Sequence, residues 1–250
     1  GKRAQGKAAY AEALEYYLTG IGLLPGDHWQ NLYELSLDLH YGKAEALHML
    51  NRHTEAINAI ESILPVLHNK HDIARLHILK IYAYVMISEY EKGINCGIDT
   101  LKNFNIIIDF DNIDMSDITK RQNLCLDHLL EHGNSITLQQ NMTAEKVLCN
   151  KIMRAMAPCA YYVNNLYLLL INLKHTEYAI EHGFNEDSII PAVTFGLLYS
   201  AMHNAYKESY IASKIAVDLA NKEKNKSLLC ETSVMFYNFI YPWNNHIRNS

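Results

Sequence analysis

Apolar residues recur at spacings of three and four along most of this chain, which is the period of an amphipathic α-helix. Short polar breaks, such as Asn51-Arg52 and Ser88-Glu89, interrupt the pattern. Helices of this length are marginal in isolation and must bury their apolar stripe against a neighbour. The pattern therefore predicts an all-α protein built from antiparallel helical hairpins.

The same hairpin pattern repeats several times along the chain. It is clearest over residues 37–67 and 74–104, with an earlier half-copy over 8–25 and a late copy over 190–220. A ring stands at the same place near each turn, at Tyr10, His53, Tyr90 and Tyr206. A small residue follows one helical turn later, at Ala13, Ala56 and Gly93. Because small side chains let helices cross closely, we expect structural repeat positions of tetratricopeptide-like hairpins here.

The region between the copies is less regular. Helices are expected over residues 116–183, including one that begins at about Pro158 and ends near Gly183. No change of composition marks a boundary, so the sequence predicts a single continuous repeat domain over 1–250. Its expected architecture is a right-handed superhelix of hairpins, an α-solenoid. The chain has no initiator Met and turns amphipathic at once, so we expect it to be a fragment of a larger protein.

Two long stretches carry a resemblance to a known family: "AAYAEALEYYLTGIGLLPGDHWQNLYELSLDLHYGKAEALHMLNRHTEAINAI" (8–60) and "AMAPCAYYVNNLYLLLINLKHTEYAIEHGFNEDSIIPAVTFGLLY" (155–199). They resemble the helical segment of large multidomain signalling proteins that combine a protein kinase, an AAA-type ATPase and a sensor histidine kinase. The resemblance implies a tetratricopeptide-like regulatory segment that serves signal transduction. The ATPase and kinase motifs of that family belong to its other modules.

Composition and charge limit which partners and which cellular compartment are expected. The formal net charge of -5 argues against nucleic acid, because phosphate binding needs a basic field. No apolar run reaches the roughly 18 residues of a membrane span. The five cysteines are scattered, with no Cys-x-x-Cys pair, and are expected to be core residues in a reducing, cytoplasmic environment. We therefore expect protein partners and neither nucleic acid nor membrane.

Motifs for catalysis or metal binding are incomplete or missing. No P-loop, kinase or nucleophile-elbow motif occurs in the sequence. His128 and His132 lie one helical turn apart but lack a third zinc ligand. An acidic string that begins at Asp109 fails as a calcium loop, because its sixth and twelfth places hold Asp114 and Lys120. We expect no enzymatic activity, no cofactor and no metal.

The candidate binding residues follow from the repeat register. The first helices of stacked hairpins line a concave surface. The register places there Asp38, Tyr41, Glu45, His48 and Met49 of one hairpin, and Arg75, Ile78, Tyr82 and Met86 of the next. Tyr and Met are favoured at binding surfaces, although packing between hairpins is the alternative for each.

Two functions remain open from the sequence. The first is a non-catalytic protein-interaction and signal-relay module, which binds a protein segment or a neighbouring domain of the parent protein on the concave face. The alternative belongs to another class, a small-molecule sensor whose ligand sits in the groove of the superhelix.

Overall fold

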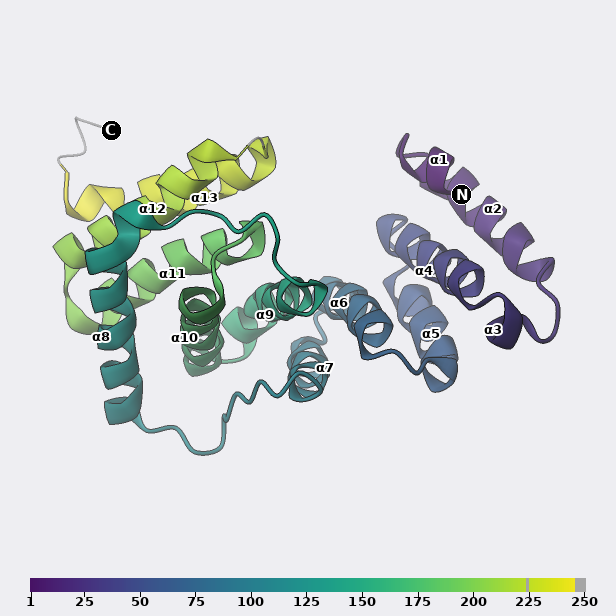
Figure 1. Cartoon of the computed structure of the whole chain (residues 1–250), viewed down its shortest axis with the longest axis horizontal. Coiled ribbons are helices and arrows are strands. Elements are labelled where there is room, and N and C mark those ends of the chain that lie inside the picture. Colours follow the sequence, from purple (N-terminus) through teal and green to yellow (C-terminus); the bar gives the residue numbers. More distant parts are fainter. Residues whose placement is uncertain (224, 246–250) are drawn as a thin grey trace. The chain divides into compact units, whose positions relative to one another are not determined.

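The structure is a computed structural model that describes residues 1–223 and 225–245. Across these residues the chain forms thirteen α-helices and three short 3-10 helices, and the single β-bridge pairs Leu138 with Phe184. The expected all-α class is confirmed. The chain divides into two compact units, Gly1–Asn105 and Ile106–Ser250, called here the N-terminal and the C-terminal unit (Figure 1). The single continuous domain expected from the sequence stays a prediction.

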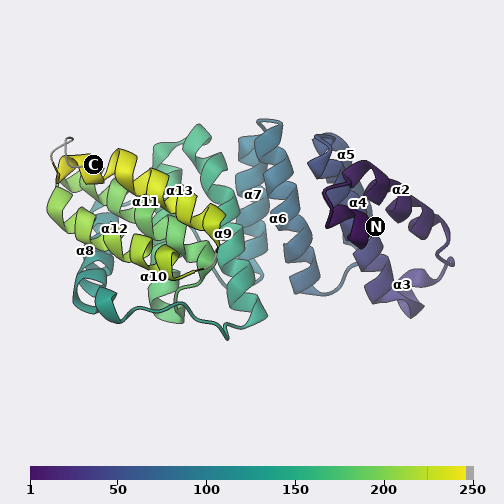
Figure 2. The same cartoon turned by 90° about the horizontal axis from the view of Figure 1, so that it is seen from above.

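The N-terminal unit consists of antiparallel helices that pack in chain order (Figure 2). Its helices are α1 (Lys2–Gln5), α2 (Tyr10–Gly22), α3 (His28–Asn31), α4 (Tyr33–Met49), α5 (His53–Ile63), α6 (Lys70–Met86) and α7 (Tyr90–Lys102), with the 3-10 helix η1 (Leu64–Val66) after α5. Helix α4 packs between α2 and α5, and α6 packs between α5 and α7. We call the helix before each hairpin turn the first helix (α1, α4, α6) and the helix after it the second helix (α2, α5, α7).

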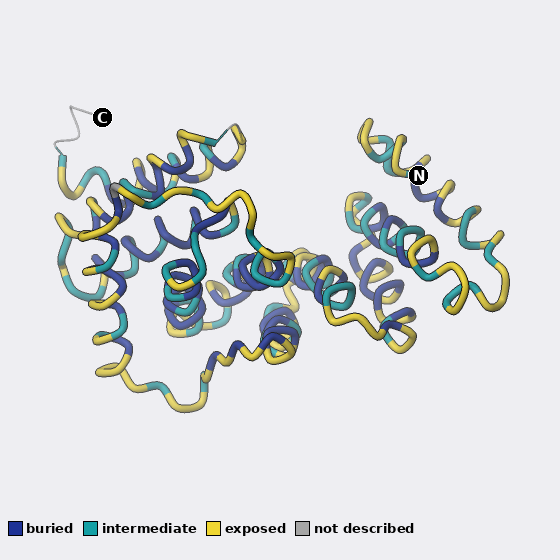
Figure 3. Tube along the Cα trace, in the orientation of Figure 1, coloured by how far each residue is buried: buried dark blue, intermediate teal, exposed yellow. Residues whose placement is uncertain are grey.

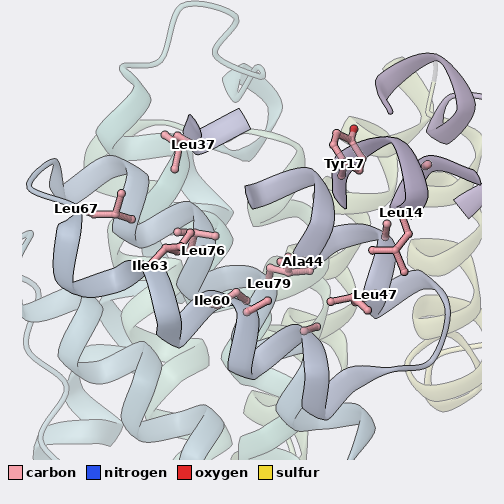
Figure 4. Close-up of a cluster of buried hydrophobic side chains, with 14 residues drawn as sticks. Leu14, Tyr17, Leu37, Ala44, Leu47, Ile60, Ile63, Leu67, Leu76 and Leu79 are labelled. Carbon is pink, nitrogen blue, oxygen red and sulfur yellow. The ribbon is translucent and has the colours of Figure 1, made fainter. Parts of the chain in front are cut away.

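One cluster of buried apolar side chains joins four of these helices, α2, α4, α5 and α6. Figure 4 shows Leu14 of α2, Leu47 of α4, Ile60 of α5 and Leu76 of α6 among its members. Each of these four residues is at most 6% exposed. Helices that are too short to be stable alone are therefore held by the shared core, as their amphipathic pattern predicts.

Four hairpin turns of the chain share a residue in the left-handed backbone conformation. A residue with left-handed φ follows the end of α1, α4, α6 and the later helix α11 (Glu186–His203) by one to three positions, at Ala8 (58°), Asn51 (60°), Ser88 (60°) and Asn204 (54°). Two residues later the second helix begins, at Tyr10, His53, Tyr90 and Tyr206. In the N-terminal unit, backbone bonds such as Arg52 N–H to Leu47 O (2.9 Å) and Glu89 N–H to Tyr84 O (3.0 Å) complete a Schellman helix end. The repeated sequence pattern thus coincides with a repeated turn.

Small residues lie where second helices face their neighbours. One helical turn after the ring residues, Ala13, Ala56 and Gly93 are all buried. A further close approach occurs at Gly42 of α4, where a Cβ atom would lie 2.3 Å from the Tyr17 ring of α2. A larger residue at this position would force the Tyr17 ring to move, so glycine favours the close packing of α2 and α4.

The C-terminal unit has longer helices. They are α8 (Met115–His132), α9 (Ala144–Val163), α10 (Asn165–His182), α11 (Glu186–His203), α12 (Tyr206–Lys222) and α13 (Lys226–Phe239), with the 3-10 helices η2 (Gly133–Ser135) and η3 (Tyr241–Trp243). Helices α9 and α10 form one antiparallel pair and α11 and α12 another, while α8 packs on α10 and α12. Figure 3 shows the buried side of each helix turned toward its neighbours.

Pro158 does not begin a helix, contrary to the expectation from the sequence. It lies inside α9, and the break comes at Asn164, whose side-chain oxygen caps α10 by accepting from Leu166 N–H (2.9 Å). A proline inside a helix removes one backbone donor and crowds the carbonyl four residues earlier, a local cost of about 3 kcal/mol that packing has to offset. The fully buried Cys159 and Ala160 that follow it keep α9 packed and continuous.

Candidate functional site

The candidate residues of α4 form a stripe along that helix. Asp38, Tyr41 and Glu45 follow each other at intervals of three and four residues, so their side chains leave the helix on one side. All three are half-buried. Burial, and after it the nearby Glu45 carboxylate, raise the pKa of Tyr41, which therefore stays a neutral phenol.

Helix α1 lies against this stripe. The Lys2 ammonium is 2.6 Å from Asp38 Oδ2, and this contact raises the pKa of Lys2. Gln5 donates from Nε2 to Glu45 Oε2, and its Oε1 accepts from the Tyr17 hydroxyl (2.7 Å). Both carboxylates of the stripe thus already hold a donor from the same chain.

Helix α6 contributes the other side of the surface. The Arg75 guanidinium stands over the Tyr41 ring, 5.0 Å from its centroid, which is a cation–π geometry. Nearer the start of both helices the Tyr33 hydroxyl donates to Asp72 Oδ2 (2.9 Å). Burial, and then this hydrogen bond, raise the pKa of Tyr33 to about 12. Polar contacts therefore connect α4 and α6 along their outer sides.

Toward the C-terminal ends of α4 and α6 the surface becomes apolar. Met49, Tyr82 and Met86 are 47%, 38% and 57% exposed, whereas Ile78 is half-buried. Met49 and Met86 occupy the same place in their hairpins, two residues before the left-handed turn residues. We define the first-helix face as Asp38, Tyr41, Glu45 and Met49 of α4 with Arg75, Tyr82 and Met86 of α6.

His48 faces the turn instead of the open surface. Its Nδ1 lies 3.1 Å from Nδ1 of His53, and the two rings meet edge to face. Burial, and then the neighbouring His53, lower the pKa of His48. His53 is only 8% exposed, so the pair closes the α4–α5 hairpin, and we leave His48 outside the first-helix face.

The C-terminal unit contains a polar cavity of about 410 Å³. Lys151 of α9 and Asp187 of α11 line it together with Gln139 and Glu223. Burial raises the pKa of Asp187, while Lys151 and Arg154 act in the opposite direction. Arg154 lies 3.5 Å from Asp187 and 3.0 Å from Glu231 of α13, so this one cation connects three helices.

The suspected metal motifs do not assemble into a centre in the part of the chain that the structure describes. His128 and His132 have ring centroids 4.8 Å apart, yet among the described residues no group of three or more His, Cys, Asp or Glu could hold an ion. Asp109 accepts from the backbone N–H of Asp111 (2.9 Å), and Asp114 caps α8 by accepting from Ser116 N–H (2.8 Å). These aspartates therefore organise the connector before α8.

Comparisons with known proteins give no relative. No family model matches the chain, and no curated protein or solved structure matches it significantly. The resemblance to multidomain signalling ATPases therefore stays a hypothesis. Within the residues described, no helix combines the length and the apolar character needed to cross a bilayer.

Sequence reasoning missed the part of α1 in this site. The repeat register that aligns Tyr10 with His53 also aligns Lys2 with Glu45 and Gln5 with His48. Applied one hairpin earlier, this register places Lys2 and Gln5 on a first helix beside α4. The segment was too short to show a helical period, so only the register could have revealed it.

Proposed function

We propose that this chain is a non-catalytic protein-interaction and signal-relay module, which docks a protein segment on the first-helix face of its N-terminal unit. The proposal includes the tetratricopeptide-like superhelix and the role as a regulatory segment of a multidomain signalling ATPase and kinase in the cytoplasm. The shared Schellman turns at Asn51 and Ser88 support the repeat class, because the same turn sets successive hairpins in the same way.

The mixed chemistry of the first-helix face is the observation that carries the proposal. It combines two carboxylates, a guanidinium stacked on a Tyr ring, and exposed Met and Tyr side chains. Aromatic, Met and Arg side chains are enriched at protein interfaces, where they provide large contact areas. A surface of this composition offers a peptide both anchoring contacts and directional polar ones.

A peptide library displayed on phage and selected against the immobilised full chain tests the docking face. The Arg75→Ala/Tyr82→Ala variant should bind the selected peptides at least about tenfold more weakly, since it removes two contact residues. A matched pair in the C-terminal unit, Tyr161→Ala/Lys207→Ala, should leave their affinity unchanged. Selected peptides that bind both variants equally well would reject the face.

A second candidate function rests on the cavity beside Asp187. Its volume falls within the roughly 300–1,000 Å³ typical of small-molecule sites, and Asp187 supplies a largely buried carboxylate next to Lys151. We propose a small polar metabolite as the ligand of this alternative. A thermal-shift screen of amino acids and amines should then give a rise in melting temperature that Asp187→Asn abolishes. No shift in the unmodified chain would remove this candidate.

A further inference from the structure

The contact between α1 and α4 identifies the chemistry of the segment that the first-helix face receives. We propose that this face binds a short basic segment that presents a Lys and, one helical turn later, a Gln, and that α1 occupies the same place within the chain. This inference rests on the proposed function and specifies its partner. Helix α1 is thus both a template for the partner and its competitor.

The charges on α4 select a basic segment. Asp38 and Glu45 are separated by two helical turns, about 10 Å along the axis, with the Tyr41 ring between them. The Lys2 ammonium reaches Asp38, and the Gln5 amide reaches Glu45. An acidic segment would set like charges against both carboxylates, which disfavours it.

The second position of the segment favours an amide. Gln5 uses both ends of its side chain, since Nε2 donates to Glu45 while Oε1 accepts from the Tyr17 hydroxyl at 2.7 Å. Lys or Arg at this position could donate to Glu45 but could not accept from Tyr17, because neither carries an acceptor. The face therefore distinguishes Lys-x-x-Gln from a purely basic sequence.

The contacts of α1 are of the kind that a competitor can replace. None of the residues of α1 is buried, and only Ala4 packs partly against the apolar core. The side chains of Lys2 and Asp38 are 73% and 48% exposed, so water screens their attraction. Asp38, Glu45 and Tyr17 belong to α4 and α2, which stay anchored in the core when α1 leaves.

A binding measurement with the segment itself tests the inference. The probe is a fluorescein-labelled peptide of residues 1–9, GKRAQGKAA, titrated with the full chain and followed by anisotropy. The Lys2→Ala/Gln5→Ala chain should bind it at least about fivefold more tightly than the unmodified chain, because an internal occupant reduces the open fraction of the face. Equal affinity for the two chains, or no binding to the Lys2→Ala/Gln5→Ala chain, would overturn the inference.

Two further variants, made in the Lys2→Ala/Gln5→Ala chain, locate the binding. Adding Asp38→Asn/Glu45→Gln should weaken peptide binding at least about tenfold, since both charged acceptors are lost. The matched control Glu15→Gln/Glu91→Gln neutralises two exposed carboxylates on second helices and should change nothing. An affinity that Asp38→Asn/Glu45→Gln leaves unchanged would contradict the inference. The proposed function would still stand if library-selected peptides depend on Arg75 and Tyr82, because the face would then bind a segment of different chemistry.

Discussion

The two units place their polar side chains differently. In the N-terminal unit, the contacts between first helices lie at the surface, as with Lys2 and Asp38 or Arg75 and Tyr41. In the C-terminal unit, ion pairs such as Arg154 with Glu231 also reach the surface, but several side-chain hydrogen bonds between helices are buried. Asn150 of α9 meets the fully buried His175 of α10 at 2.9 Å, and Asn172 of α10 donates to the Pro191 carbonyl of α11 (2.9 Å).

This difference assigns different roles to the two units. A buried polar group without a partner is costly, so the interior network of the C-terminal unit fixes one arrangement of its helices. Surface contacts are individually weak and can be exchanged for contacts with another molecule. The first-helix face therefore suits recognition, whereas the interior of the C-terminal unit suits rigidity.

The largest effect on stability is expected where α11 and α12 cross. A Cβ atom at Gly196 would lie 1.9 Å from Ser213 Oγ and 2.9 Å from the Ser209 carbonyl oxygen. Gly196→Val should lower the free energy of unfolding by about 3 kcal/mol, because the two helices must separate. Calorimetry of the full chain measures this, with Gly22→Ala, which meets no atom within 4 Å, as the control. An unchanged transition would show that the crossing is not tightly packed.

Acid should destabilise the C-terminal unit through His175. Burial lowers the pKa of His175 in the folded chain to about 3, while in the unfolded chain it stays near 6.5. Between these values only the unfolded state binds the proton, so the free energy of unfolding falls as the pH is lowered. The loss from this one residue amounts to about 1.4 kcal/mol per pH unit.

Chemical unfolding between pH 6.5 and pH 4 measures this slope. His175→Gln keeps a donor toward Asn150 and removes the titration, so its slope should be flatter. Burial also lowers the pKa values of His40 and His77 of the N-terminal unit to about 4. Both still contribute to the pH dependence of stability in that variant, so its slope should be flatter but not zero. Identical slopes for both proteins would contradict a buried neutral His175.

A smaller effect, of opposite sign, is expected at a turn of the N-terminal unit. Ser88 adopts a φ of 60°, which costs an L-residue roughly 1 kcal/mol that glycine avoids. Ser88→Gly should therefore raise the free energy of unfolding by up to about 1 kcal/mol, reduced by the loss of the Tyr90 hydroxyl contact to Ser88 Oγ (3.2 Å). Tyr90→Phe isolates that contact. Destabilisation by Ser88→Gly beyond the Tyr90→Phe effect would argue against the Schellman turn.

Much of the fold could be predicted from the sequence because the turns are local. The ring residues Tyr10, His53, Tyr90 and Tyr206 each begin a helix, two residues after a left-handed turn. Spacing along the chain is enough to find such positions. Pro158 wrongly predicted a helix start, because its cost as a helix breaker is local, whereas the burial of the α9 residues around it comes from packing.

The candidate site was predictable only in part. The repeat register put Asp38, Tyr41 and Glu45 on one surface, but it did not show that Lys2 and Gln5 reach the two carboxylates. It also placed His48 with them, whereas the side chain pairs with His53 at the turn. Contacts between separate helices depend on how the helices cross, which a single sequence does not encode in any local pattern.

The most direct test of the central claim measures the affinity of one library-selected peptide for three full chains by anisotropy. We predict at least about a tenfold loss for Arg75→Ala/Tyr82→Ala and unchanged affinity for Tyr161→Ala/Lys207→Ala, relative to the unmodified chain. Equal affinity for all three chains, or a loss confined to the Tyr161→Ala/Lys207→Ala chain, would contradict a docking role for the first-helix face.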